Sequence, residues 1–158
     1  MVSHEGNSQE SQIEIQKIKE IIEYLTNSEF QYLSDGKIKR GKITRKEIIV
    51  IAPYNKQVQK LQDCLNEKAK ISTVDKFQRR EAAVAIFSLT SSTGSYAPRG
   101  LNFLLETNRL NVAISRAKCL SIIVGSKSLL SSSVNSINKA QLINNICKIN
   151  SYNSNQII

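Results

Sequence analysis

The sequence has little that would place it in a membrane or in an extracellular, disulfide-bonded class. No apolar run approaches the roughly 20 residues of a membrane-spanning helix. The start, MVSHEGNSQE, lacks the basic residues and apolar stretch of a signal peptide. The three cysteines are far apart and odd in number, so we expect buried or half-buried side chains rather than a disulfide framework or zinc site. We therefore expect a cytoplasmic protein that does not enter a membrane.

Histidine and aromatic residues are also scarce. His4 is the single histidine, so neither a metal site nor a serine–histidine hydrolase centre is expected. Aromatic residues make up 6% of the chain, which argues against a broad base-stacking platform. The sequence has no glycine-rich loop of the GxxxxGKS/T type, so we do not expect it to cradle nucleotide phosphates by itself.

Acidic residues are outnumbered by basic ones, and the net charge of the 158 residues is +9. A basic chain favours polyanionic partners, nucleic acid first, although codon bias towards lysine and asparagine produces the same composition. With few aromatic residues, contacts to nucleic acid are expected to reach mainly the backbone. Such binding is independent of base sequence and is weakened by salt.

Short apolar runs alternate with helical patterns, which predicts a parallel α/β sheet with right-handed crossovers. Isoleucines at helical spacing predict a first helix over 7–27, capped by Asn7. The expected strands cover 48–52, 70–74, 84–89 and 120–124. The other expected elements are a loop or hairpin at 34–46, a helix containing Val58 and Leu61, a loop at 91–102, a helix at 108–118, a short helix near Leu129 and a last helix containing Leu142 and Ile146. A chain of this length makes one domain, which we place at 1–150, followed by a disordered tail at 151–158.

The segment NRLNVAISRAK, residues 108–118, places Arg109 and Arg116 seven residues apart. On one helix, two turns cover about 7.2 residues, so both guanidinium groups are expected on nearly the same face. Guanidinium is planar, permanently charged and able to donate two hydrogen bonds to one phosphate. The segment is therefore suited to offering an arginine to a phosphate, and two solvated arginines on a surface helix are the alternative.

Two other segments accompany this one, IIVIAPYNKQVQKL at 48–61 and ISTVDKFQRREAAVAIFSLT at 71–90. In this order and at these intervals, the three resemble motifs IV, V and VI of superfamily-one helicases. The subgroup with IAPYNxQV, TVDxFQGxEA and NRLNVAxSRA elements is the most similar. HEGNSQES and APRGLNFLLETNRLN also look like that subgroup. The resemblance runs from about His4 to about Ile149. It implies a RecA-like α/β domain with helices on both faces of a parallel sheet, the P-loop NTPase type lacking the P-loop itself.

The resemblance also implies a function, that of the second, C-terminal motor domain of an ATP-dependent DNA or RNA helicase. Such a domain closes over ATP and Mg²⁺ held by an N-terminal motor domain, and it grips a single strand of nucleic acid. Since the phosphate loop and the acidic magnesium motif are absent, we expect a detached or truncated domain that hydrolyses no ATP alone. The alternative is a catalytically silent nucleic-acid-binding or interaction module from a truncated helicase gene.

The resemblance assigns the nucleotide side of the site to five residues. Arg116 matches the arginine finger of motif VI, which stabilises charge on the transferring phosphoryl group. Glu81 matches a glutamate that bonds the ribose, or else it is a carboxylate at a helix start. Gln78 matches a residue that bridges the nucleotide and nucleic-acid sides, or else it is a polar loop residue. Arg109 either faces the nucleotide or pairs with a carboxylate, and Gln57 is a further candidate near a helix start.

Residues after two predicted strands match the nucleic-acid side. Pro53, Tyr54 and Asn55 follow one strand, and Thr73 and Asp75 follow another, where ligands of open α/β sheets bind. The Thr73 hydroxyl can bond phosphate oxygens, whereas Asp75 is better suited to capping the next turn. Tyr54 either stacks on a base or packs under its loop. We expect both sides of the site to line one crevice or edge.

One position departs from the motifs. The subgroup has glycine after the glutamine of FQGxEA, where this chain has Arg79. Glycine permits close approach of the backbone to nucleotide phosphates, and arginine adds bulk and charge at that contact. Arg79 therefore predicts either a decayed nucleotide contact or an added cation on the nucleic-acid face.

Overall fold

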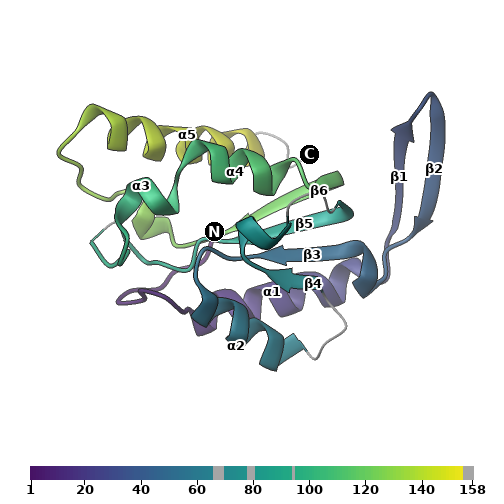
Figure 1. Cartoon of the computed structure of the whole chain (residues 1–158), viewed down its shortest axis with the longest axis horizontal. Coiled ribbons are helices and arrows are strands. Elements are labelled where there is room, and N and C mark those ends of the chain that lie inside the picture. The colour runs from purple at the N-terminus through teal and green to yellow at the C-terminus, as the bar shows by residue number, and fades with distance from the viewer. Residues whose placement is uncertain (66–69, 78–80, 94, 155–158) are drawn as a thin grey trace.

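The computed structural model describes residues 1–65, 70–77, 81–93 and 95–154. Within them, a four-stranded parallel sheet has the order β4-β3-β5-β6 (Figure 1). Its strands are β3 (Ile48–Ile51), β4 (Lys70–Ser72), β5 (Ala82–Ser88) and β6 (Ala117–Val124). Every residue of the central strands β3 and β5 is buried, as expected for parallel strands covered on both faces.

Helices cover both faces of this sheet (Figure 1). They are α1 (Gln12–Leu25), α2 (Asn55–Leu65), α3 (Gly100–Leu104), α4 (Thr107–Ile114) and α5 (Ile137–Ser154). One core joins α1 and α2 to the sheet and contains Ile18 and Leu61. The second core joins α3, α4 and α5 to the opposite face through Leu104, Leu110 and Ile146. The predicted fold, a parallel α/β sheet between two helical layers, is confirmed.

The first helix begins later than predicted. Asn7 does not cap it; Ser11 does, with its hydroxyl accepting from the backbone N–H of Glu14 at 3.3 Å. The backbone N–H of Asn7 instead donates to Ser92 Oγ at 2.9 Å. The segment before Ser11 is therefore held against the end of β5, and α1 starts only after it.

The polar stretch after α1 was predicted to be either a loop or a hairpin, and it forms a hairpin. It consists of β1 (Glu29–Ser34) and β2 (Lys37–Lys42), paired antiparallel, and it begins before the predicted boundary at 34. Asp35 and Gly36 form its two-residue turn with φ of 52° and 73°. An Asp-Gly pair with positive φ at both positions is the usual solution for such a tight hairpin.

The predicted helix over 108–118 is too long, and the prediction that Arg109 and Arg116 share it is wrong. Helix α4 ends at Ile114, Arg116 lies in the following turn, and β6 begins at Ala117. Residues from Ala117 onward hydrogen-bond to β5, so sheet pairing overrides a sequence that suits a helix equally well.

Smaller elements complete the description. Three short 3₁₀ helices are η1 (Arg45–Glu47), η2 (Val74–Phe77) and η3 (Lys127–Leu129), the last of which confirms the short helix near Leu129. Helix α3 occupies the end of the predicted loop because Leu101 and Leu104 are buried. Helix α5 enters the segment expected as a tail, and residues 155–158 lie outside the described ones. Cys119 is exposed on β6, against expectation.

Candidate nucleotide and nucleic-acid surfaces

The amino ends of β5 and β6 bring together two predicted nucleotide residues that are far apart in sequence. The backbone N–H of Ala82 donates to the carbonyl of Arg116 at 3.0 Å, so Glu81 and Arg116 flank one strand pair. The Glu81 carboxylate lies 3.6 Å from Lys118 Nζ, and both side chains are partly exposed. We call Glu81, Arg116 and Lys118 the amino edge. It offers one carboxylate and two cations to solvent.

The Arg116 side chain is held by the end of α4. Its Nε donates to the carbonyl of Val112 at 3.2 Å, and its Nη2 donates to Ser115 Oγ at 3.2 Å. A cation at this position is favoured by the partial negative charge of the last helical carbonyls. The turn after α4, rather than the helix itself, therefore fixes the position of this half-buried guanidinium.

Arg109 was predicted either to face the nucleotide or to pair with a carboxylate, and it pairs with two carboxylates. Its Nε donates to Glu106 Oε2 at 2.9 Å, and its Nη1 lies 3.4 Å from Asp75 Oδ2. The guanidinium carbon also lies 4.5 Å from the ring centroid of Phe103. Asp75, expected as a cap, thus pairs with α4, and this contact ties η2 to α4.

Pro53, Tyr54, Asn55 and Thr73 gather at the opposite end of the sheet. The backbone N–H of Ala52 donates to the carbonyl of Ser72 at 3.2 Å, which sets the ends of β3 and β4 side by side. We call this end the carboxyl edge. The expectation of one shared crevice is wrong, because parallel strands carry their carboxyl ends opposite to the amino edge. Of these residues, Asn55 is exposed and Thr73 half-buried, whereas Pro53 and Tyr54 are buried.

Tyr54 was predicted either to stack on a base or to pack under its loop, and it is packed inside the domain. Its ring centroid lies 5.8 Å from that of Phe103, and the side chain is 6% exposed. The hydroxyl is buried, and it has no hydrogen bond of normal geometry among the described residues. Burial raises the pKa of Tyr54, while the nearby Ser91 hydroxyl and Arg99 charge act in the opposite direction.

Phe103 is the centre of a cluster that sequence reasoning missed. The guanidinium carbon of Arg99 lies 4.2 Å from its ring centroid, so two arginines and Tyr54 contact this ring. Each cation gains from the negative face of the ring. The signal was present, since Arg99 and Phe103 are four residues apart at the start of a helix, where side chains at that spacing meet.

Gln57 lies inside the domain, away from the amino edge. Its side chain is fully buried, Oε1 accepts from the backbone N–H of Ser11 at 2.8 Å, and Nε2 donates to Ser88 Oγ at 3.0 Å. Both ends of the amide are thus used to join α1, α2 and β5. Because the side chain is fully buried, it is out of reach of a nucleotide, which corrects the expectation for Gln57.

His4 and Glu14 extend this buried group, which we call the polar staple. His4 Nε2 lies 2.9 Å from Glu14 Oε1, and His4 Nδ1 lies 2.8 Å from Ser92 Oγ. The two oxygens of Glu14 also accept from the backbone N–H of Thr90, at 3.0 and 2.9 Å. All four residues are buried, so the Ser92–His4–Glu14 chain is closed to substrates. It fastens the segment before α1 to the end of β5.

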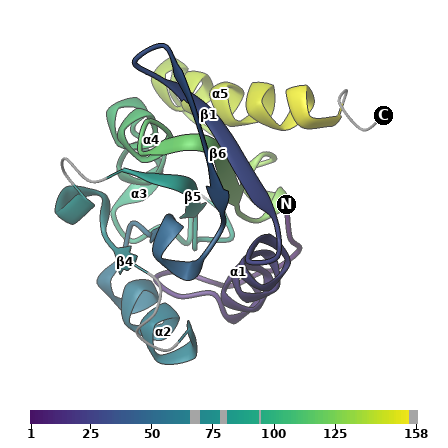
Figure 2. The same cartoon turned by 90° about the vertical axis from the view of Figure 1, so that its right-hand side faces the viewer.

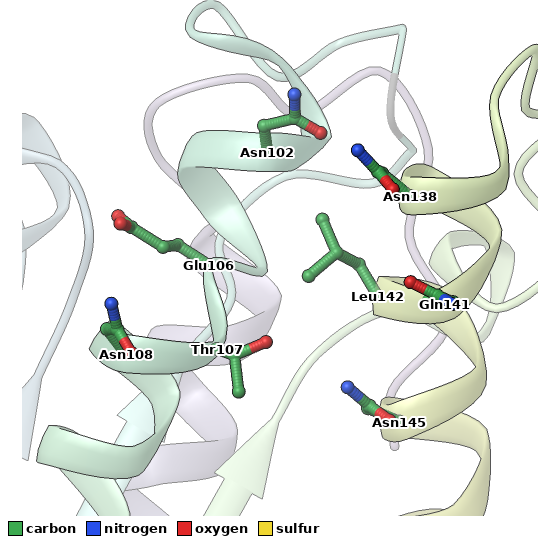
Figure 3. A pocket seen from close by; sticks show the side chains of 8 residues that line it. All are labelled: Asn102, Glu106, Thr107, Asn108, Asn138, Gln141, Leu142 and Asn145. Atoms are coloured by element: carbon green, nitrogen blue, oxygen red, sulfur yellow. The ribbon is translucent and has the colours of Figure 1, made fainter.

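A cleft of about 420 Å³ separates α3 and α4 from α5, and in Figure 3 the amides of α5 face across it. Its lining residues are Asn102, Glu106, Thr107, Asn108, Asn138, Gln141, Leu142 and Asn145. The lining contains one carboxylate and no cation, so it does not suit a phosphate. None of the predicted site residues lines it.

Some predicted features fall outside the described residues, namely Gln78 and the departing residue Arg79. Among the described residues, no three His, Cys, Asp or Glu side chains gather as metal ligands would. None of the described helices has both the length and the apolar character needed to cross a bilayer.

The chain is similar to known helicases. A family model described as an AAA domain matches residues 2–128. The putative helicase MOV-10 of Gallus gallus is 34% identical over 133 residues, which are 73% of this chain and 13% of that protein. DNA polymerase alpha-associated DNA helicase A of Schizosaccharomyces pombe is 39% identical over 97 residues, 60% of this chain and 14% of that protein. The DNA replication ATP-dependent helicase/nuclease JHS1 of Arabidopsis thaliana is 29% identical over 130 residues, 82% of this chain and 9% of that protein.

The chain thus spans between 9% and 14% of the length of these three relatives. The family model covers most of the 158 residues, and the sheet with its two helical layers agrees with the fold that such domains share. The chain belongs to the AAA domain family and is a domain of the superfamily-one helicase type.

Proposed function

We propose that the chain acts as the second motor domain of an ATP-dependent helicase. It would supply Arg116 to ATP held by a first motor domain, and it would grip single-stranded nucleic acid. The observation that carries this proposal is the meeting of Glu81 and Arg116 at the amino edge. They come from separate motifs, and a nucleotide could contact both only if the fold brought them together.

The chemistry of the amino edge fits a nucleotide. Arg116 Nε and Nη2 are hydrogen-bonded within the chain, whereas no hydrogen bond to Nη1 is found among the described residues. Nη1 and the second N–H of Nη2 are therefore donors left for phosphate oxygens, whose negative charge grows during phosphoryl transfer. The partly exposed Glu81 carboxylate can accept from a ribose hydroxyl. A first motor domain would bring the phosphate loop and the Mg²⁺ ligands.

The carboxyl edge would hold the single strand. Asn55 and Thr73 are its accessible groups, and they can bond phosphate oxygens. The buried Pro53 and Tyr54 would support the loop from below. Relatives named as DNA helicases and as an RNA helicase both occur, which supports DNA or RNA as the substrate class.

The test joins this chain to the first motor domain of a related helicase and measures ATP turnover and strand binding. Arg116→Ala is expected to reduce turnover by a factor on the order of 10³, because an arginine finger contributes that much. Strand binding should remain. Arg40→Ala, which removes the same charge from the β1–β2 hairpin, is the matched control and should retain turnover. Full turnover in the Arg116→Ala fusion would favour the silent nucleic-acid-binding module instead.

A further inference from the structure

The β1–β2 hairpin stands clear of the helices at one end of the sheet (Figure 1). It carries four cations, Lys37, Lys39, Arg40 and Lys42, against two carboxylates, Glu29 and Asp35. In Figure 2 its strand β1 passes in front of β6. Cys119 Sγ of β6 donates to the carbonyl of Gln31 at 3.8 Å, and Lys118 Nζ lies 5.5 Å from the Tyr32 ring centroid.

The strand register sorts the hairpin into two faces. Tyr32 pairs with Lys39, Ser34 with Lys37, and Phe30 with Gly41. Directly paired residues point to the same side of an antiparallel ladder. Phe30, Tyr32, Lys37 and Lys39 therefore share one side, which we call the ring face. Arg40 and Lys42 lie on the opposite, outer face.

The two rings of the ring face form a small stack. The centroids of Phe30 and Tyr32 are 6.0 Å apart, and their planes differ by 22°. Gly41 makes room for this arrangement, since a Cβ atom there would lie 2.9 Å from Phe30 Cζ. Both rings are half-buried, and Phe30 also packs against the core that contains Ile18 and Leu61. The ring face thus carries two nearly parallel rings and, by the strand register, Lys37 and Lys39.

Lysines alone would need no further explanation, because exposed edge strands carry them to prevent pairing with other chains. A half-buried pair of stacked rings does not serve that purpose. Rings that accept bases, with cations that accept the intervening phosphates, are how proteins bind single strands without reading their sequence. We propose that the ring face binds single-stranded nucleic acid, with bases on Phe30 and Tyr32 and phosphates on Lys37 and Lys39. This surface lies outside the helicase motifs and needs neither ATP nor a first motor domain.

The first test compares two double variants of the whole chain that lose the same charge. The ring-face variant, Lys37→Ala with Lys39→Ala, removes both lysines of the ring face. The outer-face variant, Arg40→Ala with Lys42→Ala, removes both cations of the outer face. Fluorescence anisotropy with labelled oligo-dT and oligo-U, without nucleotide, gives the affinity across a salt series. The ring-face variant should lower the salt slope by about 1.4, because each single-strand phosphate contact contributes about 0.7. The outer-face variant should lower it less. Equal losses would mean a general charge effect and would overturn the proposal.

The second test addresses the rings. Tyr32→Leu keeps an apolar side chain on the strand but removes the flat ring, and it should weaken binding by about tenfold. Tyr32→Phe keeps the ring and should bind as the parent does. Circular dichroism checks that both variants are folded. Parent-like affinity in Tyr32→Leu would overturn base stacking here and leave the rings as a surface for another protein. The assay contains no nucleotide and no first motor domain, so its result does not depend on the proposed role of Arg116 in ATP turnover.

Discussion

The two ends of the central strands hold polar groups in opposite settings. Near the carboxyl edge, Glu14 and Gln57 are fully buried, and each is bonded to at least two partners within the domain. At the amino edge, Glu81 and Lys118 form one partly exposed pair at 3.6 Å. A buried group is costly to leave unpaired, whereas an exposed ion pair contributes little and is easily replaced. Burial thus separates the polar groups that stabilise this fold from those free to meet a ligand.

The largest effect is expected from comparing the two glutamates. Glu14→Ala leaves the Thr90 N–H and the His4 ring without their partner in the interior, so it should lower the free energy of unfolding by about 3 kcal/mol or more. Glu81→Ala removes an exposed carboxylate and should change it by less than about 0.5 kcal/mol. Urea unfolding of both variants measures the contrast. Similar values would contradict the assignment of the two edges to structure and to binding.

A smaller loss should follow when Gln57 is changed. Gln57→Ala strands the buried N–H of Ser11, so stability should fall by about 1–3 kcal/mol. Gln59, on the exposed side of the same helix, provides the control, and Gln59→Ala should be nearly neutral. In the fusion with a first motor domain, Gln57→Ala should leave the apparent affinity for ATP unchanged below the unfolding temperature. A weaker affinity in a fully folded variant would restore a nucleotide role for Gln57.

The smallest effect concerns Tyr54, which is buried yet has no hydrogen bond of normal geometry within the described part of the chain. Since burial raises its pKa above 10.0, the folded state keeps the proton longer than the unfolded state does. Its contribution is therefore complete below pH 10 and declines as the pH rises above that value. Tyr54→Phe should be neutral or slightly stabilising near pH 7 and should reduce the loss above pH 10. Tyr24→Phe, at an exposed position, should reproduce neither change in pH-dependent thermal unfolding.

The sheet was predictable because its strands are continuous apolar runs, such as IIVI in β3. The end of α4 was not predictable, because residues 115–118 also suit a helix. In the folded domain, hydrogen bonds with β5 begin at Arg116 and make the following residues a strand. The polar staple was also missed. It joins His4 to Ser92 and Ser11 to Gln57, and such distant pairs leave no periodic signal. The motif resemblance predicted Glu81 and Arg116 as site residues, but only the fold separates their edge from that of Thr73.

The ion pair between Asp75 and Arg109 also connects the two edges. Thr73 follows β4 at the carboxyl edge and Glu81 precedes β5 at the amino edge. Asp75 pairs with Arg109 of α4, and the end of α4 holds Arg116. In the proposed motor, strand and nucleotide would therefore act on the same piece of structure. Thermodynamic linkage then makes their effects reciprocal: if a bound strand raises the affinity for nucleotide by some factor, the nucleotide raises the affinity for the strand by that factor.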